Sequence, residues 1–414
     1  MMTDVNELSE HLVSLNISPE SQIVQHCKWK NKNKNKTKKN KKKDGKRVMM
    51  VVPGKQFHHS SINHSPSVMP RFFSSSKEVA LFQNNHLYSL TEKNLVPQLK
   101  SDVAMLAQRN LLESRELKRP YLGINLYENQ DKYELMDSQE LDDSISCFKY
   151  MESWEEQNKS IYGLNRKFII ISARHNIVDI AMIPFTKQNG SVSLTCLFRP
   201  GNILSLSRDL SDTSGTETGA NSKDTFTRKI CFSGFALEDV LTEGITEKRK
   251  PIFSIVENIL DNNITLLLRC EMDAFNPVTK TFTELKCYSL IKYSNPNHRR
   301  KLLKTWIQTG LIPNSDVVVG IRDTQNGDLT DIFQFDREHL YKKLANRNLP
   351  QRQIEWNFNP LLSTEWLAYA LKTITTTVQK VLDKIGSENA LAFNIKIDTN
   401  LNIKVELTDT PSLY

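Results

Sequence analysis

Two short acidic motifs lie close together in the middle of the chain. The first is Glu-Met-Asp at 271–273, which ends an apolar run, and the second is Glu-Leu-Lys at 284–286. On a strand, residues two apart project from one face, so the outer residues of each motif would form a same-face pair. Ten residues lie between Asp273 and Glu284, which is enough for a hairpin loop. Carboxylates that close would repel each other without a cation, so the pattern predicts divalent-metal ligands.

An alternative interpretation of the two motifs is a solvated face with a cross-strand salt bridge. Their flanks argue against it, because 266–268 is Leu-Leu-Leu and the second motif is followed by Tyr288, Leu290 and Ile291. Such flanks indicate a semi-buried site, in which an unpaired carboxylate is costly. The spacing Asp, ten residues, Glu-x-Lys is similar to that of restriction-endonuclease-like nucleases, so we expect phosphodiester hydrolysis.

Phosphodiester hydrolysis requires charge stabilisation, an activated water and help for the leaving oxygen. Two divalent ions about 4 Å apart can supply all three. Hard cations such as Mg²⁺ or Mn²⁺ prefer oxygen ligands, so we expect Asp273, Glu271 and Glu284 to bind two such ions. The Leu285 carbonyl is a further candidate ligand because its side chain points away. Lys286 would lie beside the metals and orient the water or neutralise the transition state.

Three residues outside the motifs are candidates on position alone. Glu238 lies on an expected helix and is either a metal ligand or an exposed charge. Arg174 follows an apolar run and either binds a phosphate or is solvated. Gln308, two residues beyond Trp306, either contacts a ribose or phosphate or faces solvent.

The net charge of the chain comes from one segment. The 414 residues carry +8, but residues 28–47 hold eleven Lys and one Arg against one Asp, which is +11 and leaves −3 for the rest. We expect residues 1–65 to be a disordered basic tail that either attracts phosphates or directs import. Residues 66–414 should form one catalytic domain, with a flexible insertion at 208–227. The absence of paired cysteine spacing and of a membrane-spanning apolar run predicts a soluble intracellular protein.

Hydrophobic patterns outline the elements that must position the site. Apolar, β-branched runs predict a three-strand meander at 167–174, 177–185 and 191–198. Helices are expected at 230–243, 298–309 and 361–385, and further strands at 316–322, 390–396 and 401–407. Around the two motifs the order is helix, strand, strand, helix, strand. We therefore expect an α/β (α+β) fold with a restriction-endonuclease-like mixed sheet core, flanked by helices and with extra strands and helices.

From about residue 78 to its C-terminus the chain resembles the decapping-exoribonuclease (DXO) family. Six short motifs occur in the family's order: Arg174 with Pro184-Phe185, then 234–238, 271–273, 284–286, 301–308 and 317–322. Each motif is weak alone, but their shared order is specific. The chain departs from the family at 173–175, where Ala-Arg-His stands in place of an aromatic residue, Arg and Gly. The resemblance therefore leaves the preferred 5′-end group open.

The resemblance also implies roles for individual residues. It makes Glu238 a metal ligand, beside Glu271, Asp273, Glu284 and Leu285. The substrate contacts that it implies are Ala173, Arg174, His175, Ser254, Glu271, Lys286 and Gln308.

The activity implied by the resemblance is on RNA 5′ ends. The family removes incompletely methylated caps as an intact cap dinucleotide, often removes nicotinamide-type (NAD) caps, and in many members degrades RNA 5′→3′. The basic tail and the insertion lie outside the resemblance and favour a divergent fungal member of the cytoplasmic type. We also expect a monomer. One alternative is a nuclear RNA 5′ pyrophosphohydrolase that binds and stabilises a large 5′→3′ exoribonuclease. Another is a DNA nuclease, because the hairpin spacing alone does not select RNA.

Overall fold

Two mixed β-sheets organise the part of the chain that the computed structural model describes, residues 49–57, 69–83, 86–106, 111–130, 147–151, 168–186, 190–208, 224–243, 251–261, 264–293, 295–345, 359–385 and 390–408. In these residues the larger sheet runs β1 (Met49–Val52), β16 (Ile403–Thr408), β15 (Leu391–Asp398), β6 (Ser191–Arg199), β7 (Ile203–Arg208), β5 (Phe168–Ala173), β10 (Ile264–Glu271), β9 (Phe253–Asp261), β2 (Ser75–Gln83) and β3 (His86–Tyr88). The smaller runs β14 (Leu329–Phe335), β13 (Ser315–Arg322), β12 (Thr281–Tyr288), β11 (Ala274–Asn276), β4 (Gln98–Leu99) and β8 (Thr242–Glu243).

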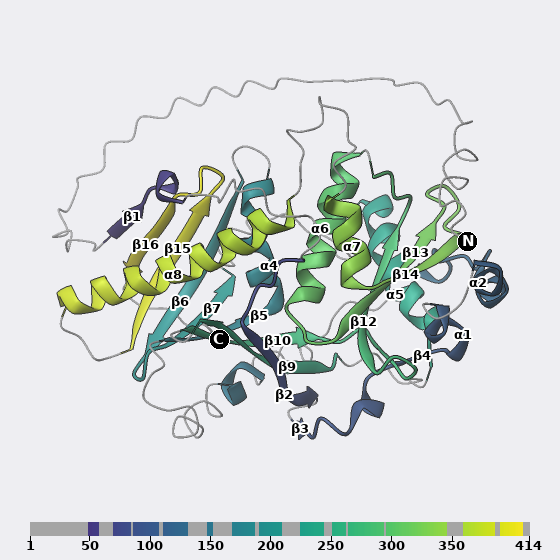
Figure 1. Cartoon of the computed structure of the whole chain (residues 1–414), viewed down its shortest axis with the longest axis horizontal. Coiled ribbons are helices and arrows are strands. Elements are labelled where there is room, and N and C mark those ends of the chain that lie inside the picture. The colour runs from purple at the N-terminus through teal and green to yellow at the C-terminus, as the bar shows by residue number, and fades with distance from the viewer. Residues whose placement is uncertain are drawn as a thin grey trace, which may run out of the picture. The chain divides into compact units, whose positions relative to one another are not determined.

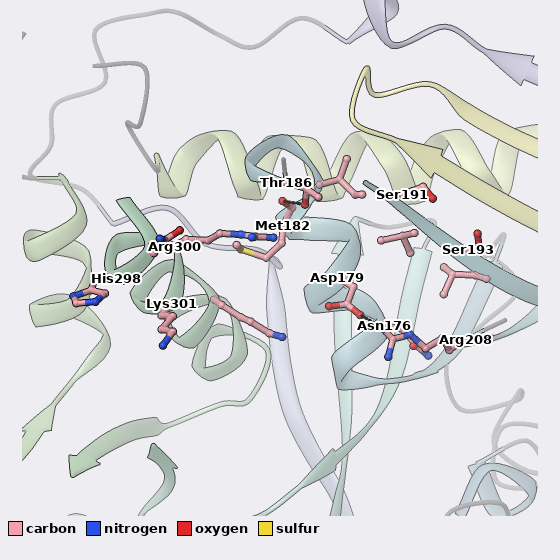
Figure 2. Close-up of a pocket in the computed structure, with 15 residues that line it drawn as sticks. Asn176, Asp179, Met182, Thr186, Ser191, Ser193, Arg208, His298, Arg300 and Lys301 are labelled. Atoms are coloured by element: carbon pink, nitrogen blue, oxygen red, sulfur yellow. Dashed lines mark hydrogen bonds and ion pairs between the residues drawn. The ribbon is translucent and has the colours of Figure 1, made fainter. Parts of the chain in front are cut away.

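Helices cover both sheets (Figure 1). Their bounds are α1 (Ser101–Ala104), α2 (Leu111–Lys118), α4 (Arg174–Met182), α5 (Thr225–Leu241), α6 (Pro296–Gly310), α7 (Arg337–Ala345) and α8 (Pro360–Ile385). The long helix α8 lies across the larger sheet, where it packs on β16. Helix α4 packs against α6, and a groove opens between them (Figure 2).

The chain crosses from the larger sheet to the smaller one at the first acidic motif. Strand β10 lies between β5, to which it is parallel, and β9, to which it is antiparallel. After Glu271 it passes through Met272 and Asp273 into β11, which pairs with β12 in the smaller sheet. The expected hairpin therefore exists, but it is formed by β11 and β12, and β10 belongs to the other sheet.

The two faces of β12 pack against different helices. Leu285 and the neighbouring Val318 belong to one buried cluster with Leu237 of α5, whereas Val317 and Val319 belong to the cluster that includes Trp306 of α6. Gly320 permits this closeness, because a Cβ there would lie 2.5 Å from a Leu237 methyl carbon. Glu284 pairs in register with Val317 and therefore lies on the α6 side.

The fold class expected from the sequence is confirmed: large mixed sheets are flanked by helices. The helices expected at 230–243, 298–309 and 361–385 are α5, α6 and α8, and the strand at 316–322 is β13. No helix in the described ranges is both long and apolar enough to span a membrane.

Three sequence expectations need correction. The segment 177–185 is not a strand, because residues 174–182 form α4. Within the expected disordered tail, β1 pairs with β16 and Phe57 packs on Trp366, with 5.4 Å between ring centroids. The insertion expected at 208–227 is shorter, because β7 extends to 208 and α5 begins at 225, capped by Asp224. The rest of that insertion, 209–223, and residues 1–48 and 58–65 of the tail lie outside the described residues.

Candidate active site

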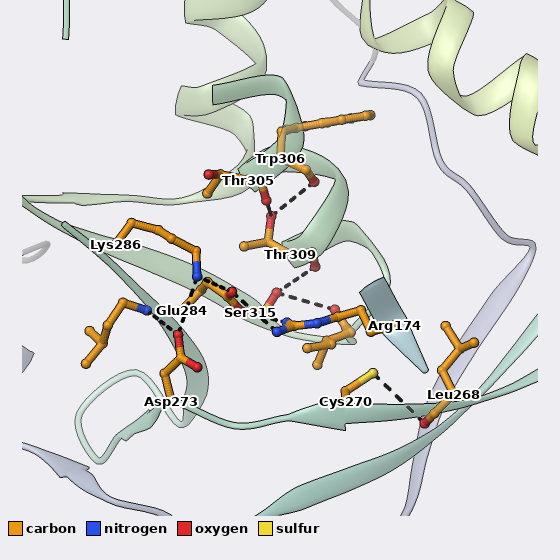
Figure 3. Close-up of polar contacts among 12 residues, drawn as sticks. Arg174, Leu268, Cys270, Asp273, Glu284, Lys286, Thr305, Trp306, Thr309 and Ser315 are labelled. Carbon is orange, nitrogen blue, oxygen red and sulfur yellow. Dashed lines mark hydrogen bonds and ion pairs between the residues drawn. The ribbon is translucent and has the colours of Figure 1, made fainter. Parts of the chain in front are cut away.

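The two carboxylates of the first acidic motif differ in solvent exposure. Glu271 ends β10 and is exposed, whereas Asp273 follows the strand and is half-buried. The Leu285 backbone N–H donates a hydrogen bond of 2.9 Å to Asp273 Oδ2 (Figure 3). This bond ties the crossing segment to the middle of β12.

Glu284 lies at the centre of a cluster of charges. It is 6% exposed and accepts two hydrogen bonds from Arg174, Nη1 to Oε2 at 2.6 Å and Nη2 to Oε1 at 3.3 Å. Lys286, two residues along the same face of β12, places Nζ 2.5 Å from Glu284 Oε1 and 3.7 Å from Asp273 Oδ2. Two carboxylates and two cations from α4, β12 and the crossing segment therefore meet at one point (Figure 3).

The cluster shifts the pKa values of both carboxyl groups. Burial, followed by repulsion from Glu284, raises the pKa of Asp273 to about 6, although Lys286 and Arg174 act in the opposite direction. Burial alone would raise the pKa of Glu284, but Arg174 and Lys286 outweigh it and lower that pKa to about 2. Burial opposes the charge of Lys286 as well, yet Glu284 and Asp273 raise its pKa, so the amine stays protonated.

The donor set suits a hard divalent cation. Glu271, Asp273 and Glu284 line one small cavity of about 10 Å³, close to the ~10–15 Å³ that one water molecule requires. Within the described residues, no three His, Cys, Asp or Glu side chains are already grouped as a metal shell. Arg174 and Lys286 here neutralise charge that a cation would neutralise, and the pKa of Asp273 stays raised by burial and then by repulsion from Glu284. The carboxylates thus fit a metal ion, provided that Glu284 exchanges part of its contacts with Arg174 and Lys286.

The Leu285 side chain points away from the cluster, as expected. It is buried with Leu237 and Val318 under α5. Glu238 lies on the same helix and is half-exposed, but it does not line the carboxylate cavity in the described part of the chain. Its role as a metal ligand stays a prediction.

The expected substrate contacts are placed unevenly. Arg174 is in the cluster, but its partner is Glu284 rather than solvent. Ala173 is buried directly before α4, and His175 is exposed directly after Arg174. Ser254 is fully buried and donates a hydrogen bond of 3.0 Å to Glu78 Oε1, and Gln308 is half-buried on α6. The structure thus brings Arg174 and Lys286 to the carboxylates, whereas the roles of the other four stay predictions.

Sequence reasoning missed a residue on the face of β12 that carries Glu284 and Lys286. Tyr288 follows Lys286 by two positions on β12, and its hydroxyl lies 2.8 Å from Thr305 Oγ1 of α6. The period of two that links Glu284 to Lys286 extends to Tyr288, so the signal was present in the sequence. Tyr288 is therefore more than an apolar flank of the motif.

The chain is similar in sequence to proteins of known activity. The family model "RAI1 like PD-(D/E)XK nuclease" matches residues 84–412. The chain is 40% identical over 372 residues to Decapping and exoribonuclease protein 1 of Saccharomyces cerevisiae, with 88% of this chain and 84% of that protein covered. It is 30% identical over 368 residues to the protein of the same name from Kluyveromyces lactis, with 87% and 89% covered.

The solved structures agree with the sequence comparison. The crystal structure of K. lactis Dxo1 in complex with manganese matches with a TM-score of 0.70 and 26% identity, over 88% of this chain and 100% of that chain. Candida albicans Rai1 in complex with pU5–Mn²⁺ matches with a TM-score of 0.59 at 18% identity, over 83% and 93%, and supports the fold alone. The resemblance expected from the motif order is therefore confirmed. The chain belongs to the RAI1-like PD-(D/E)XK nuclease family, a family of metal-dependent hydrolases.

Proposed function

We propose that the protein removes incompletely methylated or NAD-type caps from RNA by hydrolysing the first phosphodiester, which releases a cap dinucleotide, and then degrades the RNA 5′→3′. The observation that carries this proposal is the cluster of Asp273, Glu284 and Lys286 at the junction of the two sheets. The names of the two curated relatives, each a decapping and exoribonuclease protein, support the substrate class.

The residues of the cluster would divide the work. Glu271, Asp273, Glu284 and the Leu285 carbonyl would hold two divalent ions, Mg²⁺ or Mn²⁺, which stabilise charge on the phosphate and activate water. Water adds to phosphorus, the bond to the leaving oxygen breaks, and a proton from that water ends on the leaving oxygen. Glu284 and Asp273 raise the pKa of Lys286, so its ammonium would act as a donor to the water or the phosphate. Arg174 holds Glu284 ionised and would present its guanidinium to a phosphate oxygen.

An alternative function for this protein is to bind and stabilise a large 5′→3′ exoribonuclease. This alternative is less favoured. The similarity to Dxo1 reaches 26% identity and a TM-score of 0.70, whereas S. pombe Rai1 gives 16% and 0.57. The acidic and Lys positions of the site are also intact. We further propose that the protein is monomeric and cytoplasmic, which sedimentation and a fluorescent fusion would test.

Removing two expected ligands tests the proposed activity. Glu271→Ala combined with Asp273→Ala should leave 5′-labelled capped RNA intact in Mg²⁺ or Mn²⁺, a loss on the order of 10²-fold or more. Calorimetric titration with Mn²⁺ should show weakened binding by the same variant. The matched control is Glu113→Ala with Glu116→Ala, two exposed carboxylates of α2, which should behave as wild type. Cleavage by the site variant at the wild-type rate would show that the metal-site assignment is wrong.

The released product identifies the substrate and the reaction. Mass analysis should find a cap dinucleotide from unmethylated or NAD-capped RNA, pyrophosphate if the enzyme is a pyrophosphohydrolase, and mononucleotides from the exonuclease step. Equal cleavage of matched single-stranded DNA would remove the preference for RNA.

A further inference from the structure

A basic groove of about 1120 Å³ lies between α4 and α6 (Figure 2). One wall comes from α4, β6 and β7, including Asn176, Asp179 and Arg208. The other comes from the first half of α6, including Arg300 and Lys304. Within the described residues these walls are far apart in the sequence, and only the packing of α4 on α6 brings them together.

The groove carries a positive charge. Arg208, Arg300, Lys301 and Lys304 give four positive charges, and Asp179 is the one carboxylate among the described lining residues, which leaves +3. Asp179 lies 3.4 Å from Arg208, so its charge is directed at one end of the groove. His298 adds no charge near neutral pH, because burial and then Lys301 and Lys292 lower its pKa.

The basic residues of α6 divide into one internal residue and three that line the groove. Arg299 is 2% exposed and donates to the carbonyl oxygens of Lys343 and Leu344, so it holds α6 to α7. Arg300 and Lys304 are four apart and therefore lie on one face of the helix, next to Lys301. This face lines the groove; Lys301 and Lys304 are exposed, and Arg300 is half-buried.

Helix α4 and one contact with an aromatic ring connect the groove to the face of β12 that carries Glu284 and Lys286. Helix α4 begins with Arg174, the partner of Glu284, and presents Asp179 to the groove slightly more than one turn later. Lys301 Nζ lies 5.6 Å from the centre of the Tyr288 ring, and Tyr288 shares its face of β12 with Glu284 and Lys286. Both links place the groove near the face of β12 that carries Glu284 and Lys286.

We propose that this groove holds the sugar-phosphate backbone of the RNA nucleotides that follow the cleaved bond. A track of positive charge, here with one of its lysines in contact with the Tyr288 ring, suits the backbone of a single-stranded nucleic acid without sequence preference. The proposal rests on the proposed function, because it names RNA as the polymer whose 5′ end reaches Lys286. It adds that affinity depends on RNA length.

The test compares long and short RNA on the full-length protein. Arg300→Gln with Lys304→Gln removes two charges of the groove and no residue of the carboxylate cluster. The matched control, Lys380→Gln with Lys384→Gln, removes two exposed charges from the C-terminal end of α8. Binding of a 5′-phosphorylated 15-nucleotide RNA is measured by fluorescence anisotropy in EDTA, which prevents cleavage, and a 3-nucleotide RNA is measured by competition.

For the 15-nucleotide RNA we expect the groove variant to lose about 5-fold in affinity for each phosphate contact at 0.1 M salt, up to about 25-fold. The slope of log K against log salt should flatten by about 0.7 for each contact. The 3-nucleotide RNA should bind as before, and the control variant should match wild type with both RNAs.

Each other result has a defined meaning. Unchanged binding of the 15-nucleotide RNA would overturn the proposal that the groove binds RNA. An equal loss of affinity for both RNA lengths would also overturn it, because the two residues would then act on the 5′ end or on folding. A lowered melting temperature of the variant would identify impaired folding as the cause. If wild type cleaves no capped RNA but the length-dependent loss is found, the groove stands and the proposed decapping activity fails.

Discussion

Helix α4 contributes to two arginine–carboxylate pairs that carry the same charges but differ in distance and in burial. At its start, Arg174 meets Glu284 at 2.6 Å, and the side chains are 9% and 5% exposed. Slightly more than one turn later, Asp179 meets Arg208 at 3.4 Å, and the side chains are 25% and 57% exposed. The first pair lies in the carboxylate cluster and the second in the groove.

Burial decides what each pair can do. In the cluster, leaving either charge without its partner is costly, so Arg174 holds Glu284 ionised and in place. In the groove, water and salt screen the pair, so a passing phosphate can take over Arg208 at little cost. The same two chemical groups therefore hold Glu284 in position in the cluster, whereas in the groove they leave Arg208 available to a phosphate.

The largest effect should come from breaking the buried pair. Arg174→Met leaves Glu284 with Lys286 alone, and we expect a loss of unfolding free energy at the lower end of about 3–5 kcal/mol. Arg208→Met, the matched change in the exposed pair, should cost less than about 1 kcal/mol. Urea unfolding followed by tryptophan fluorescence measures both. Equal losses would mean that burial does not separate the two pairs as argued.

A smaller effect should follow from shortening the N-terminus. Deleting residues 1–65 removes β1 from the edge of the larger sheet and Phe57 from Trp366 and Tyr369. Phe57 is half-buried, so loss of its contact alone should cost less than the roughly 1.5–3 kcal/mol of a fully buried Phe. Deleting only residues 1–45 removes most of the basic run and leaves both contacts. If the two deletions have the same melting temperature, β1 and Phe57 do not contribute to stability.

The smallest effect concerns the basic run, which tests whether surface charge outside the groove also matters. Residues 28–45 hold ten Lys and one Asp. Without residues 1–45, RNA affinity should fall mainly at low salt, and the salt slope should flatten by about 0.7 for each phosphate that the run neutralises in the full-length protein. The cleavage rate at saturating RNA should not change, because no residue of the cluster lies in this segment. An unchanged slope would identify the run as a segment without a role in RNA binding.

Local sequence was sufficient for several elements and for the central motif. Helices α5 and α6 have capping residues, Asp224 and Asn295, and apolar residues at helical spacing. Glu284 and Lys286 share a face because a strand repeats every two residues, which holds in any tertiary setting. The family was likewise predictable, because motif order is a property of the sequence itself.

Helix α4 was misread because its local signals oppose a helix. Ala173 offers no capping side chain, and Arg174 places a positive charge at the helix N-terminus, where the dipole disfavours it. Nearly every side is buried, so the alternation of polar and apolar residues that marks a surface helix is missing, and Ile177 and Val178 favour a strand. Packing against α6 and α8, together with the bond to Glu284, stabilises the helix instead.

The sequence by itself determined which residues are equipped for phosphodiester chemistry and which family the chain resembles. Tertiary structure alone decided that Arg174 pairs with Glu284, 110 positions away, and that α4 and α6 enclose a basic groove. The physical reason is that spacing along one strand or helix is fixed by backbone geometry. Contacts between elements depend on how buried side chains fit together.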